Sequence, residues 1–183
     1  MERDEEAALV RAVAGGDRAA FRRLVETHQR PLSAFARRML RDAEQADDIV
    51  QETLLRLWLR ATSFDPRAAR LTTWLHNIAH NLCVDSLRRG SRAAALDRDD
   101  AAVPLDAADP MADEETRRRA ARVRDAIAGL PERQRSALLL CHYQGLSNRD
   151  AAQILDVSVD ALESLLARGR RRLRRELEVD DEP

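Results

Sequence analysis

The sequence predicts an all-α protein of two small helical domains, and three observations lead to this prediction. Aromatic residues make up only 3% of the 183 residues, whereas apolar residues make up 44% and are largely Ala, Leu and Val, a composition that favours small helical units. Apolar residues recur at the i, i+3, i+4, i+7 spacing of amphipathic helices on both sides of one interruption. That interruption is an acidic segment, which separates two basic parts of the chain.

Charge is unevenly distributed along the chain, although the formal net charge is only -1. Residues 17–92 carry 14 arginines and 9 acidic residues, a net charge of +5, and residues 117–178 carry 14 and 8, a net charge of +6. Residues 93–116 have a net charge of -7, contain two prolines and show no helical periodicity, which indicates a flexible acidic linker. We therefore expect domains at residues 1–92 and 117–183, joined by a linker at 93–116.

The same sequence argues against several classes of protein. Residues 1–16 are charged and no apolar run reaches about 18 residues, so we expect a cytoplasmic location and no direct membrane insertion. Cys83 and Cys141 lie far apart, and we expect small buried hydrophobic residues rather than a disulfide. There is no Gly-rich phosphate loop and no Ser, His and Asp set in a recognisable context, so we predict that the protein is not an enzyme.

The first domain is expected to hold four helices. Asp17 can cap the first helix, and Pro31 suits the first turn of the second. Their apolar residues are Phe21, Leu24, Val25, Phe35 and Met39. After a loop at residues 63–70, the fourth helix ends at Gly90, a residue type common just after a helix. We expect this helix to bury Trp74, Leu75, Ile78 and Leu82.

The third helix, from about residue 42 to 61, has one apolar and one acidic face. The apolar face consists of Ala46, Ile49, Val50, Thr53, Leu54, Leu57 and Trp58. The other face carries an acidic patch made of Asp47, Asp48, Gln51 and Glu52. No basic residue of the helix neutralises this patch before Arg56, so a basic partner could dock there.

The second domain begins with an Arg-rich helix at residues 117–128, which ends at Gly129, and a new helix starts at Pro131. Ser147 with Asp150 three residues later fits a capping box, and Ser158 can cap the next helix after a tight turn. The inner faces of these two helices are expected to consist of Ala151, Ile154, Leu155, Val159, Leu162, Leu165, Leu166 and Leu173. Helices joined by so short a turn cross steeply, and this helix-turn-helix arrangement fits its second helix into the major groove of DNA.

The outer face of that second helix predicts contact with DNA. It carries Ser158, Asp160, Glu163, Ser164, Ala167, Arg168 and Arg171. Six arginines lie within residues 168–175. The shorter side chains at the start of the helix can reach base edges, while the arginines meet phosphates where the helix leaves the groove. The alternative is a solvated Arg-rich helix end that only complements the helix dipole.

Four stretches of the chain resemble the signature segments of one family. They read "ADDIVQETLLRLWLRA", "FDPRAARLTTWLHNIAHN", "LPERQRSALLL" and "GLSNRDAAQILDVSVDALESLLARGRRRLR". In this order, and with a linker of matching length, the chain is similar to the extracytoplasmic-function (ECF) sigma factors, the small two-domain initiation factors of bacterial RNA polymerase. The resemblance covers nearly all of residues 17–92 and 117–177. It implies a region 2-like four-helix domain and a region 4-like helix-turn-helix domain.

The resemblance implies roles for particular residues of the first domain. The acidic patch matches the family's surface for the clamp helices of the polymerase β′ subunit. The loop at residues 63–70 and the following helix match the part that recognises the minus-10 element and holds a base flipped out of the melted non-template strand. Phe64, Asp65 and Asn81 fall at positions for that role, with Arg88 and Arg89 near duplex phosphates.

In the second domain, the resemblance implies recognition of the minus-35 element. Glu163, Ser164, Ala167 and Arg168 fall at the base-reading positions, and Arg171 falls close to the DNA backbone. Glu163 departs from the family, in which this position is often basic, and would accept a hydrogen bond from a cytosine amino group. The acidic linker matches the segment that the family is thought to thread into the RNA exit path; an acidic tether that favours solubility is the alternative.

As a whole, the resemblance implies a dissociable specificity subunit with three partners. These are core RNA polymerase, contacted at the β′ clamp helices and the β flap, promoter DNA, and an anti-sigma factor that masks both surfaces. No cofactor is expected, because the polymerase supplies the catalytic magnesium and the nucleotides. Two alternatives stay open: a sigma mimic that titrates an anti-sigma factor without binding DNA, and a helix-turn-helix transcriptional regulator.

A metal site is a further alternative from the residues alone. His76, His80 and Cys83 fall at i, i+4 and i+7 on one helix, a spacing that suits metal ligands. Otherwise the two histidines line a DNA-facing surface while Cys83 packs in the core. No fourth ligand lies close in sequence.

Overall fold

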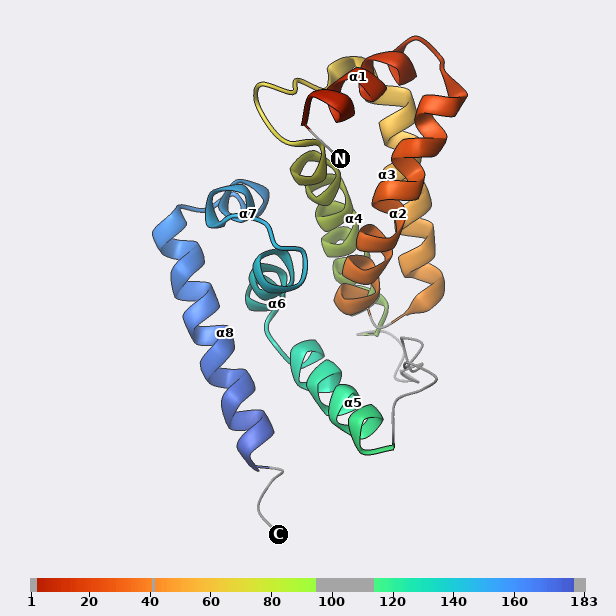
Figure 1. The fold of residues 1–183 in the computed structure, drawn as a ribbon. Helices are drawn as coiled ribbons and strands as arrows, with labels where there is room; N and C mark the ends of the chain where they lie inside the picture. Colours follow the sequence, from red (N-terminus) through yellow and green to blue (C-terminus); the bar gives the residue numbers. More distant parts are fainter. Residues whose placement is uncertain (1–2, 41, 95–113, 180–183) are drawn as a thin grey trace. The chain divides into compact units, whose positions relative to one another are not determined.

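The computed structural model describes residues 3–40, 42–94 and 114–179, and within these ranges the chain forms helices and connecting loops but no strand. Figure 1 shows the helices α1 (Arg3–Ala14), α2 (Arg18–Leu40), α3 (Ala43–Arg60), α4 (Leu71–Ala94), α5 (Glu114–Ala128), α6 (Glu132–Leu138), α7 (Asn148–Leu155) and α8 (Val159–Val179). The short 3-10 helix η1 (Ala61–Ser63) follows α3, and the π-helical segment η2 (Leu139–Tyr143) follows α6. The all-α prediction is confirmed. None of these helices is long and apolar enough to cross a membrane.

The chain divides into two compact units. The first combines Met1–Ala36 with Glu44–Asp99, and the second combines Arg37–Ala43 with Asp100–Pro183. Each unit has an apolar core of its own. In the first unit the core includes Leu24, Leu32, Phe35, Leu57, Leu71 and Leu75, and in the second Leu138, Leu139, Leu140, Ile154 and Leu162.

In the first unit, α2, α3 and α4 lie side by side. Phe21 of α2 meets Trp58 of α3 edge to face, with ring centroids 5.2 Å apart. Phe35 of α2 meets His76 of α4 in the same way at 5.5 Å. Ser86 Oγ of α4 donates a 2.7 Å hydrogen bond to Gln45 Oε1 of α3. Aromatic edges and one interhelical hydrogen bond therefore add specificity to the aliphatic core.

α2 is one continuous helix rather than two. As predicted, Asp17 caps it, since Asp17 Oδ1 accepts hydrogen bonds from the backbone N–H of Ala19 at 2.8 Å and of Ala20 at 3.1 Å. The prediction that a new helix starts at Pro31 is wrong, because Pro31 lies inside α2. A proline there costs about 3 kcal/mol. Burial of one unbroken stripe offsets this cost, and the stripe consists of Leu24, His28, Leu32, Phe35, Ala36 and Met39.

α4 differs from its prediction at its end and on its inner face. It continues past Gly90 to Ala94. Gly90 does not take the positive φ of a left-handed cap, which in the described ranges is found at the glycines Gly16 and Gly145. Leu75 is buried as predicted, but Trp74, Ile78 and Leu82 are only half-buried. The buried stripe consists of Leu71, Thr73, Leu75, His76, Ala79, His80, Cys83 and Val84. Packing against α2 and α3 selects this stripe over the neighbouring apolar one.

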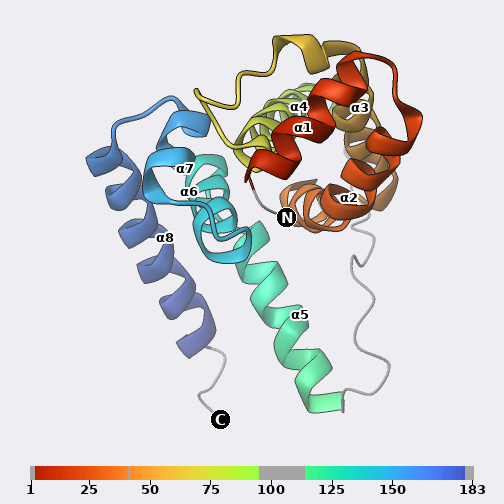
Figure 2. The same cartoon turned by 45° about the horizontal axis from the view of Figure 1, so that its top comes forward.

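α1 is not predicted by the sequence patterns above, since charged residues surround its short apolar stripe. It buries Ala7, Leu9, Val10 and Val13. It ends in a Schellman motif, in which Gly16 has φ 87° and donates to the Val13 carbonyl at 2.9 Å, while Asp17 N–H donates to the Ala12 carbonyl at 3.0 Å. α1 lies across one end of the other helices of this unit, as Figures 1 and 2 show.

In the second unit, the helix-turn-helix prediction is confirmed by α7, α8 and the turn between them. Ser147 Oγ accepts from Asp150 N–H at the start of α7, and Ser158 Oγ accepts from Ala161 N–H at the start of α8, both at 3.1 Å. Asp156 takes the left-handed conformation with φ 50°, which reverses the chain between the two helices. Figure 1 shows α7 across the beginning of α8.

The inner face of α8 is as predicted with one exception. Leu162, Leu165 and Leu166 are buried, and Leu173 is half-buried. Val159, predicted to pack inward, is 40% exposed, because it is the first residue of the helix, where the surface is only partly covered.

Gly169 permits a close approach of α8 to α6. It is buried, and a Cβ atom at this position would lie 2.8 Å from Leu138 Cδ1 and 3.6 Å from Gln134 Cβ. A separation under 3 Å is shorter than any ordinary contact between carbon atoms. The approach of the two helices therefore depends on the missing side chain.

Three buried histidines form part of the core of the first unit. His28, His76 and His80 are 4%, 1% and 8% exposed. Burial lowers the pKa of His28 and of His80 to about 4, so both are neutral at pH 7. Glu6 Oε1 lies 3.3 Å from His28 Nε2, and burial raises the pKa of Glu6. The prediction that His76 and His80 line a surface is wrong, because α4 turns both toward the core.

We expect Gly169→Ala to destabilise the second unit by about 1–3 kcal/mol, because the added methyl group overpacks the contact with α6. Gly90→Ala is the matched control: Gly90 is an exposed helical glycine with nothing within 4 Å of an added Cβ. That substitution should stabilise α4 by about 0.5–1 kcal/mol. Urea unfolding followed by circular dichroism measures both. A urea midpoint of the Gly169→Ala variant at or above the wild-type value would contradict the close packing of α8 against α6.

We expect the first unit to lose stability as pH falls from 7 to 5. An unfolded histidine, with a pKa near 6.5, takes up a proton in this range. His28 and His80 do not, because burial lowers their pKa to about 4. Each histidine should therefore remove about 2 kcal/mol of stability over this interval, part of which the raised pKa of Glu6 opposes.

Urea unfolding at both pH values, followed by the fluorescence of Trp58 and Trp74, checks this pH dependence. In a His80→Gln variant, the part of the stability loss between pH 7 and pH 5 that His80 causes should disappear. A stability that stays constant between pH 7 and pH 5 would contradict the burial of neutral histidines.

Candidate functional site

The outer face of α8 is available for contact along its whole predicted length. Ser158, Asp160, Glu163, Ser164, Arg168 and Arg171 are exposed, and Ala167 is half-buried. The six arginines between residues 168 and 175 are all exposed as well. Acidic and small side chains therefore occupy the beginning of the helix, and positive charge follows two turns later. This order suits base edges in a groove followed by phosphates.

Glu163 is held by a neighbouring element. Asn148 Nδ2, in the first turn of α7, donates a 3.3 Å hydrogen bond to Glu163 Oε1. Asn148 Oδ1 lies 3.8 Å from the thiol Sγ of Cys141. A carboxylate with two oxygens keeps acceptor capacity after one such bond, so Glu163 can still accept from a base.

The acidic patch lies on the outer face of α3. Asp47, Asp48 and Gln51 are exposed, and Glu52 is half-buried. Arg56 Nε donates to Glu52 Oε1 at 2.7 Å, an i,i+4 pair that partly neutralises this end of the patch.

Two apolar side chains that were not predicted from the sequence extend this patch. Leu55 is 48% and Leu59 is 66% exposed. With Asp48 and Glu52 they are spaced 4, 3 and 4 residues apart, so all four lie along one face of α3. Their helical spacing from Asp48 is the signal that could have identified them. An exposed leucine pair beside a charged patch is typical of a protein-binding surface.

The loop between η1 and α4, residues 64–70, is called the recognition loop below. Phe64 is half-buried and meets Trp74 of α4 edge to face, with centroids 5.8 Å apart. Asp65 is exposed, and its Oδ1 accepts from Arg67 N–H at 2.8 Å. Its backbone carbonyl accepts from Ala68 N–H at 3.1 Å and from Ala69 N–H at 3.3 Å. The loop is therefore an ordered turn that presents an aromatic ring next to a carboxylate.

Asn81, Arg88 and Arg89 are exposed on α4. Trp74, Asn81 and Arg88 follow one another at intervals of seven residues, which places them on one face of the helix. Asn81 Nδ2 donates to Asn77 Oδ1 at 3.2 Å. The predicted minus-10 residues thus form two groups: Phe64 and Asp65 in the recognition loop, and the amide and arginines further along α4.

His76, His80 and Cys83 do not form a metal centre in this structure. In the ranges that the structure describes, no group of three or more His, Cys, Asp and Glu side chains could hold a metal ion. His76 Nδ1 lies 2.8 Å from the Thr72 carbonyl. Burial raises the pKa of Cys83 to about 12, which disfavours the thiolate that binds metal.

Comparison with known proteins identifies both units. The family models described as Sigma-70 region 2 and Sigma-70, region 4 match residues 24–93 and 120–173. The ECF RNA polymerase sigma factor SigM of Mycobacterium tuberculosis is 37% identical over 171 residues, which cover 93% of this chain and 83% of SigM. The ECF RNA polymerase sigma factor SigW of Bacillus subtilis is 27% identical over 183 residues, covering 92% of this chain and 94% of SigW.

Two solved structures resemble this chain along most of its length. CnrH, in complex with the cytosolic domain of CnrY, is 29% identical with a TM-score of 0.74, covering 97% of this chain and 99% of CnrH. The sigma factor RpoE from Bartonella quintana, in complex with the anti-sigma factor NepR, is 26% identical with a TM-score of 0.75, covering 87% of this chain and 98% of RpoE.

The family models match region 2 and then region 4, in that order along the chain. SigM is 37% identical over nearly the whole chain. This chain belongs to the ECF RNA polymerase sigma factors of the sigma-70 family.

Proposed function

We propose that this chain binds core RNA polymerase and directs it to promoters as a dissociable specificity subunit. The observation that carries the proposal is the outer face of α8, where every predicted base-reading position except the half-buried Ala167 is exposed. Six exposed arginines on the same helix supply the phosphate contacts. The chain itself performs no chemistry in this proposal and needs no cofactor, and it acts in the cytoplasm, where core polymerase transcribes.

The division of labour follows the two units. A region 2-like domain at residues 1–92 binds the β′ clamp helices and the minus-10 element, and a region 4-like domain at residues 117–183 binds the minus-35 element and the β flap. The family matches at residues 24–93 and 120–173 support this division. Of the acidic linker assigned to residues 93–116, residues 95–113 lie outside the described residues, whereas residues 93–94 belong to α4 and residues 114–116 to α5.

In the minus-10 role, Phe64 and Asp65 hold a base flipped from the non-template strand, and Asn81 contacts the same strand. Arg88 and Arg89 contact phosphates of the adjoining duplex. The ordered turn of the recognition loop supports this role, because a loop whose shape is fixed in advance loses less conformational freedom when it holds an extruded base. Trp74 is half-buried and meets Phe64 edge to face, so in this role it supports Phe64 rather than stacking on a base.

In the core-binding role, the acidic patch attracts basic residues of the β′ clamp helices, and Leu55 and Leu59 supply apolar contact beside it. Charge gives such an interface its orientation and association rate, while buried leucines lengthen its lifetime.

Control by an anti-sigma factor is part of the proposal. CnrH and RpoE, the two solved relatives, are each in complex with a partner, the cytosolic domain of CnrY and the anti-sigma factor NepR. An equivalent partner of this chain would cover the surfaces that bind core polymerase and DNA.

We predict that Arg168→Ala and Asp48→Ala separate the two binding functions. Arg168→Ala should reduce promoter-specific transcription by about tenfold and leave the affinity for core polymerase nearly unchanged, because it removes a DNA contact. Asp48→Ala should weaken core binding and leave the DNA preference of the assembled holoenzyme intact. Run-off transcription and fluorescence titration with core polymerase measure the two effects. Equal loss of both activities in each variant would show that the surfaces are wrongly assigned.

We predict that Leu59→Ser weakens core binding by about tenfold, the loss that removing one apolar interface contact produces. The same change should not destabilise the fold, since Leu59 is 66% exposed. Leu57→Ser serves as the opposite control, because Leu57 is fully buried and its loss should unfold the first unit. An unchanged affinity of the folded Leu59→Ser variant would exclude Leu59 from the interface.

The central experiment is run-off transcription with purified core polymerase, followed by sequencing of the transcript starts. Addition of the chain should shift initiation to a set of promoters that share minus-35 and minus-10 sequences. Failure to bind core, or an unchanged set of starts, would refute the proposal.

A further inference from the structure

The proposed function assigns no role to α1, which precedes the residues matched by the region 2 family model. We propose that α1 is a positioning element for the recognition loop, acting mainly through Arg3. This inference rests on the proposed minus-10 role of that loop.

α1 contacts both the recognition loop and the segment that leads into it. Arg3 Nη2 donates a 2.5 Å hydrogen bond to the carbonyl of Pro66, across 63 residues of sequence. The guanidinium of Arg70, at the other end of the loop, acts on the Glu6 carboxyl: burial raises the pKa of Glu6, and Arg70 opposes that rise. The helix also packs against η1, which ends one residue before Phe64. Pro66 in the loop and η1 before it are thus both in contact with α1, and the charge of Arg70 acts on Glu6 of the same helix.

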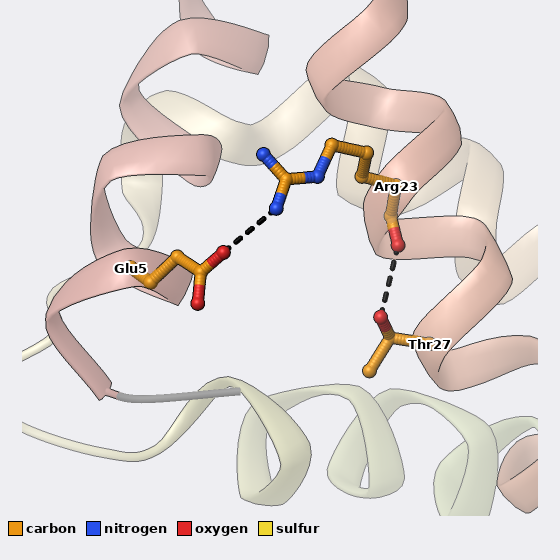
Figure 3. Close-up of polar contacts among 3 residues, drawn as sticks. All are labelled: Glu5, Arg23 and Thr27. Carbon is orange, nitrogen blue, oxygen red and sulfur yellow. Dashed lines mark hydrogen bonds and ion pairs between the residues drawn. The ribbon is translucent and has the colours of Figure 1, made fainter.

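α1 is in turn fixed to α2. Arg23 Nη2 of α2 donates to Glu5 Oε1 at 2.7 Å, as Figure 3 shows, and Thr27 one turn later donates to the Arg23 carbonyl at 3.0 Å. His28 Nε2 lies 3.3 Å from Glu6 Oε1 in a buried position. The exposed Glu5–Arg23 pair contributes little by itself. Together with the buried face of Leu9, Val10 and Val13, the Glu5–Arg23 and Glu6–His28 contacts join α1 to α2 and to the core of the first unit.

Two points near the start of the recognition loop are therefore held by different elements. Phe64 rests on Trp74 of α4, whereas the carbonyl of Pro66 is held by Arg3 of α1. Asp65 lies between these two points and is the residue whose carboxylate the loop presents. Without Arg3, the backbone after Asp65 still has the hydrogen bonds within its own turn and the bond from Trp74 N–H of α4 to the Arg70 carbonyl, but it loses its side-chain donor from α1. With Arg3 in place, the position of Asp65 relative to Phe64 is fixed more tightly. Arg3 thus affects how well these two side chains fit a flipped base, although it does not touch the DNA.

Hydrogen exchange tests the structural half of this inference on the whole chain. In Arg3→Ala, the amides of Ala68 and Ala69 should exchange about two- to tenfold faster, the range expected for the loss of one hydrogen bond. Amides in the buried parts of α3 and α4 should not change, since Arg3 is an exposed residue. Arg3→Lys, which keeps a donor, should restore most of the protection. Arg11→Ala is the matched control, removing an exposed arginine from the last turn of the same helix.

Holoenzyme binding tests the functional half. The probes are a single-stranded non-template oligonucleotide carrying the minus-10 sequence mapped by start-site sequencing, and the same oligonucleotide with those bases scrambled. Arg3→Ala should lower the ratio of the two affinities by about two- to tenfold, with unchanged affinity for core polymerase, and Arg3→Lys should recover it. Arg11→Ala should leave the ratio at the wild-type value.

The outcomes separate this inference from the proposed function. If Arg3→Ala behaves like Arg11→Ala in exchange, or if exchange in the loop rises while the affinity ratio is unchanged, α1 is not a positioning element for recognition. If the wild-type holoenzyme shows no preference for the minus-10 oligonucleotide, the proposed minus-10 role of the loop fails and the inference fails with it, whereas the exchange data still decide whether α1 fixes the loop.

Discussion

The function of this chain depends on how each amphipathic helix is rotated about its own axis, and burial of one apolar stripe fixes that rotation. On α8, burial of Leu162, Leu165 and Leu166 with the close approach at Gly169 turns Glu163, Ser164 and Arg168 outward. On α3, burial of Ile49, Leu54 and Leu57 turns Asp48 outward in the same way. The apolar contacts are not specific to any partner. Their placement decides which polar residues a partner can reach.

Charge imposes a second constraint. The chain has no lysine, and its 31 basic residues are all arginines, which stay protonated at any physiological pH. Each unit leaves most of its arginines exposed, keeps Arg135 and a few others half-buried, and fills its core with aliphatic residues and, in the first unit, with neutral histidines. The net charge of -1 is the sum of two basic segments and one acidic segment along the chain, so a near-zero total does not mean an evenly neutral sequence. An uneven charge distribution of this kind suits attraction to a polyanion.

Rigidity differs between the proposed contact surfaces in a way that fits their tasks. The reading positions of α8 and the acidic patch stand on long helices, whose backbone is fixed by regular hydrogen bonds. The recognition loop has no such ladder and depends on Trp74, an internal turn and α1. A surface that reads an intact duplex can be presented by a helix. A loop that holds a single extruded base needs contacts with several neighbouring elements, because its own backbone lacks the regular hydrogen bonds of a helix.

Local patterns in the chain were enough to predict the helical class, the helix-turn-helix with its capping serines, the buried stripe of α3 and the exposed faces of α3 and α8, because helical periodicity and caps are local properties. Packing between distant segments is what makes α2 run through Pro31, makes α4 pass Gly90 and bury its histidines, and leaves Val159 exposed. The tertiary structure also revealed α1 and its contact with the recognition loop. These features depend on partners far away in the chain, since packing between helices can outweigh the local preference of a proline, a glycine or a histidine, and no pattern within one helix records which surface will cover it.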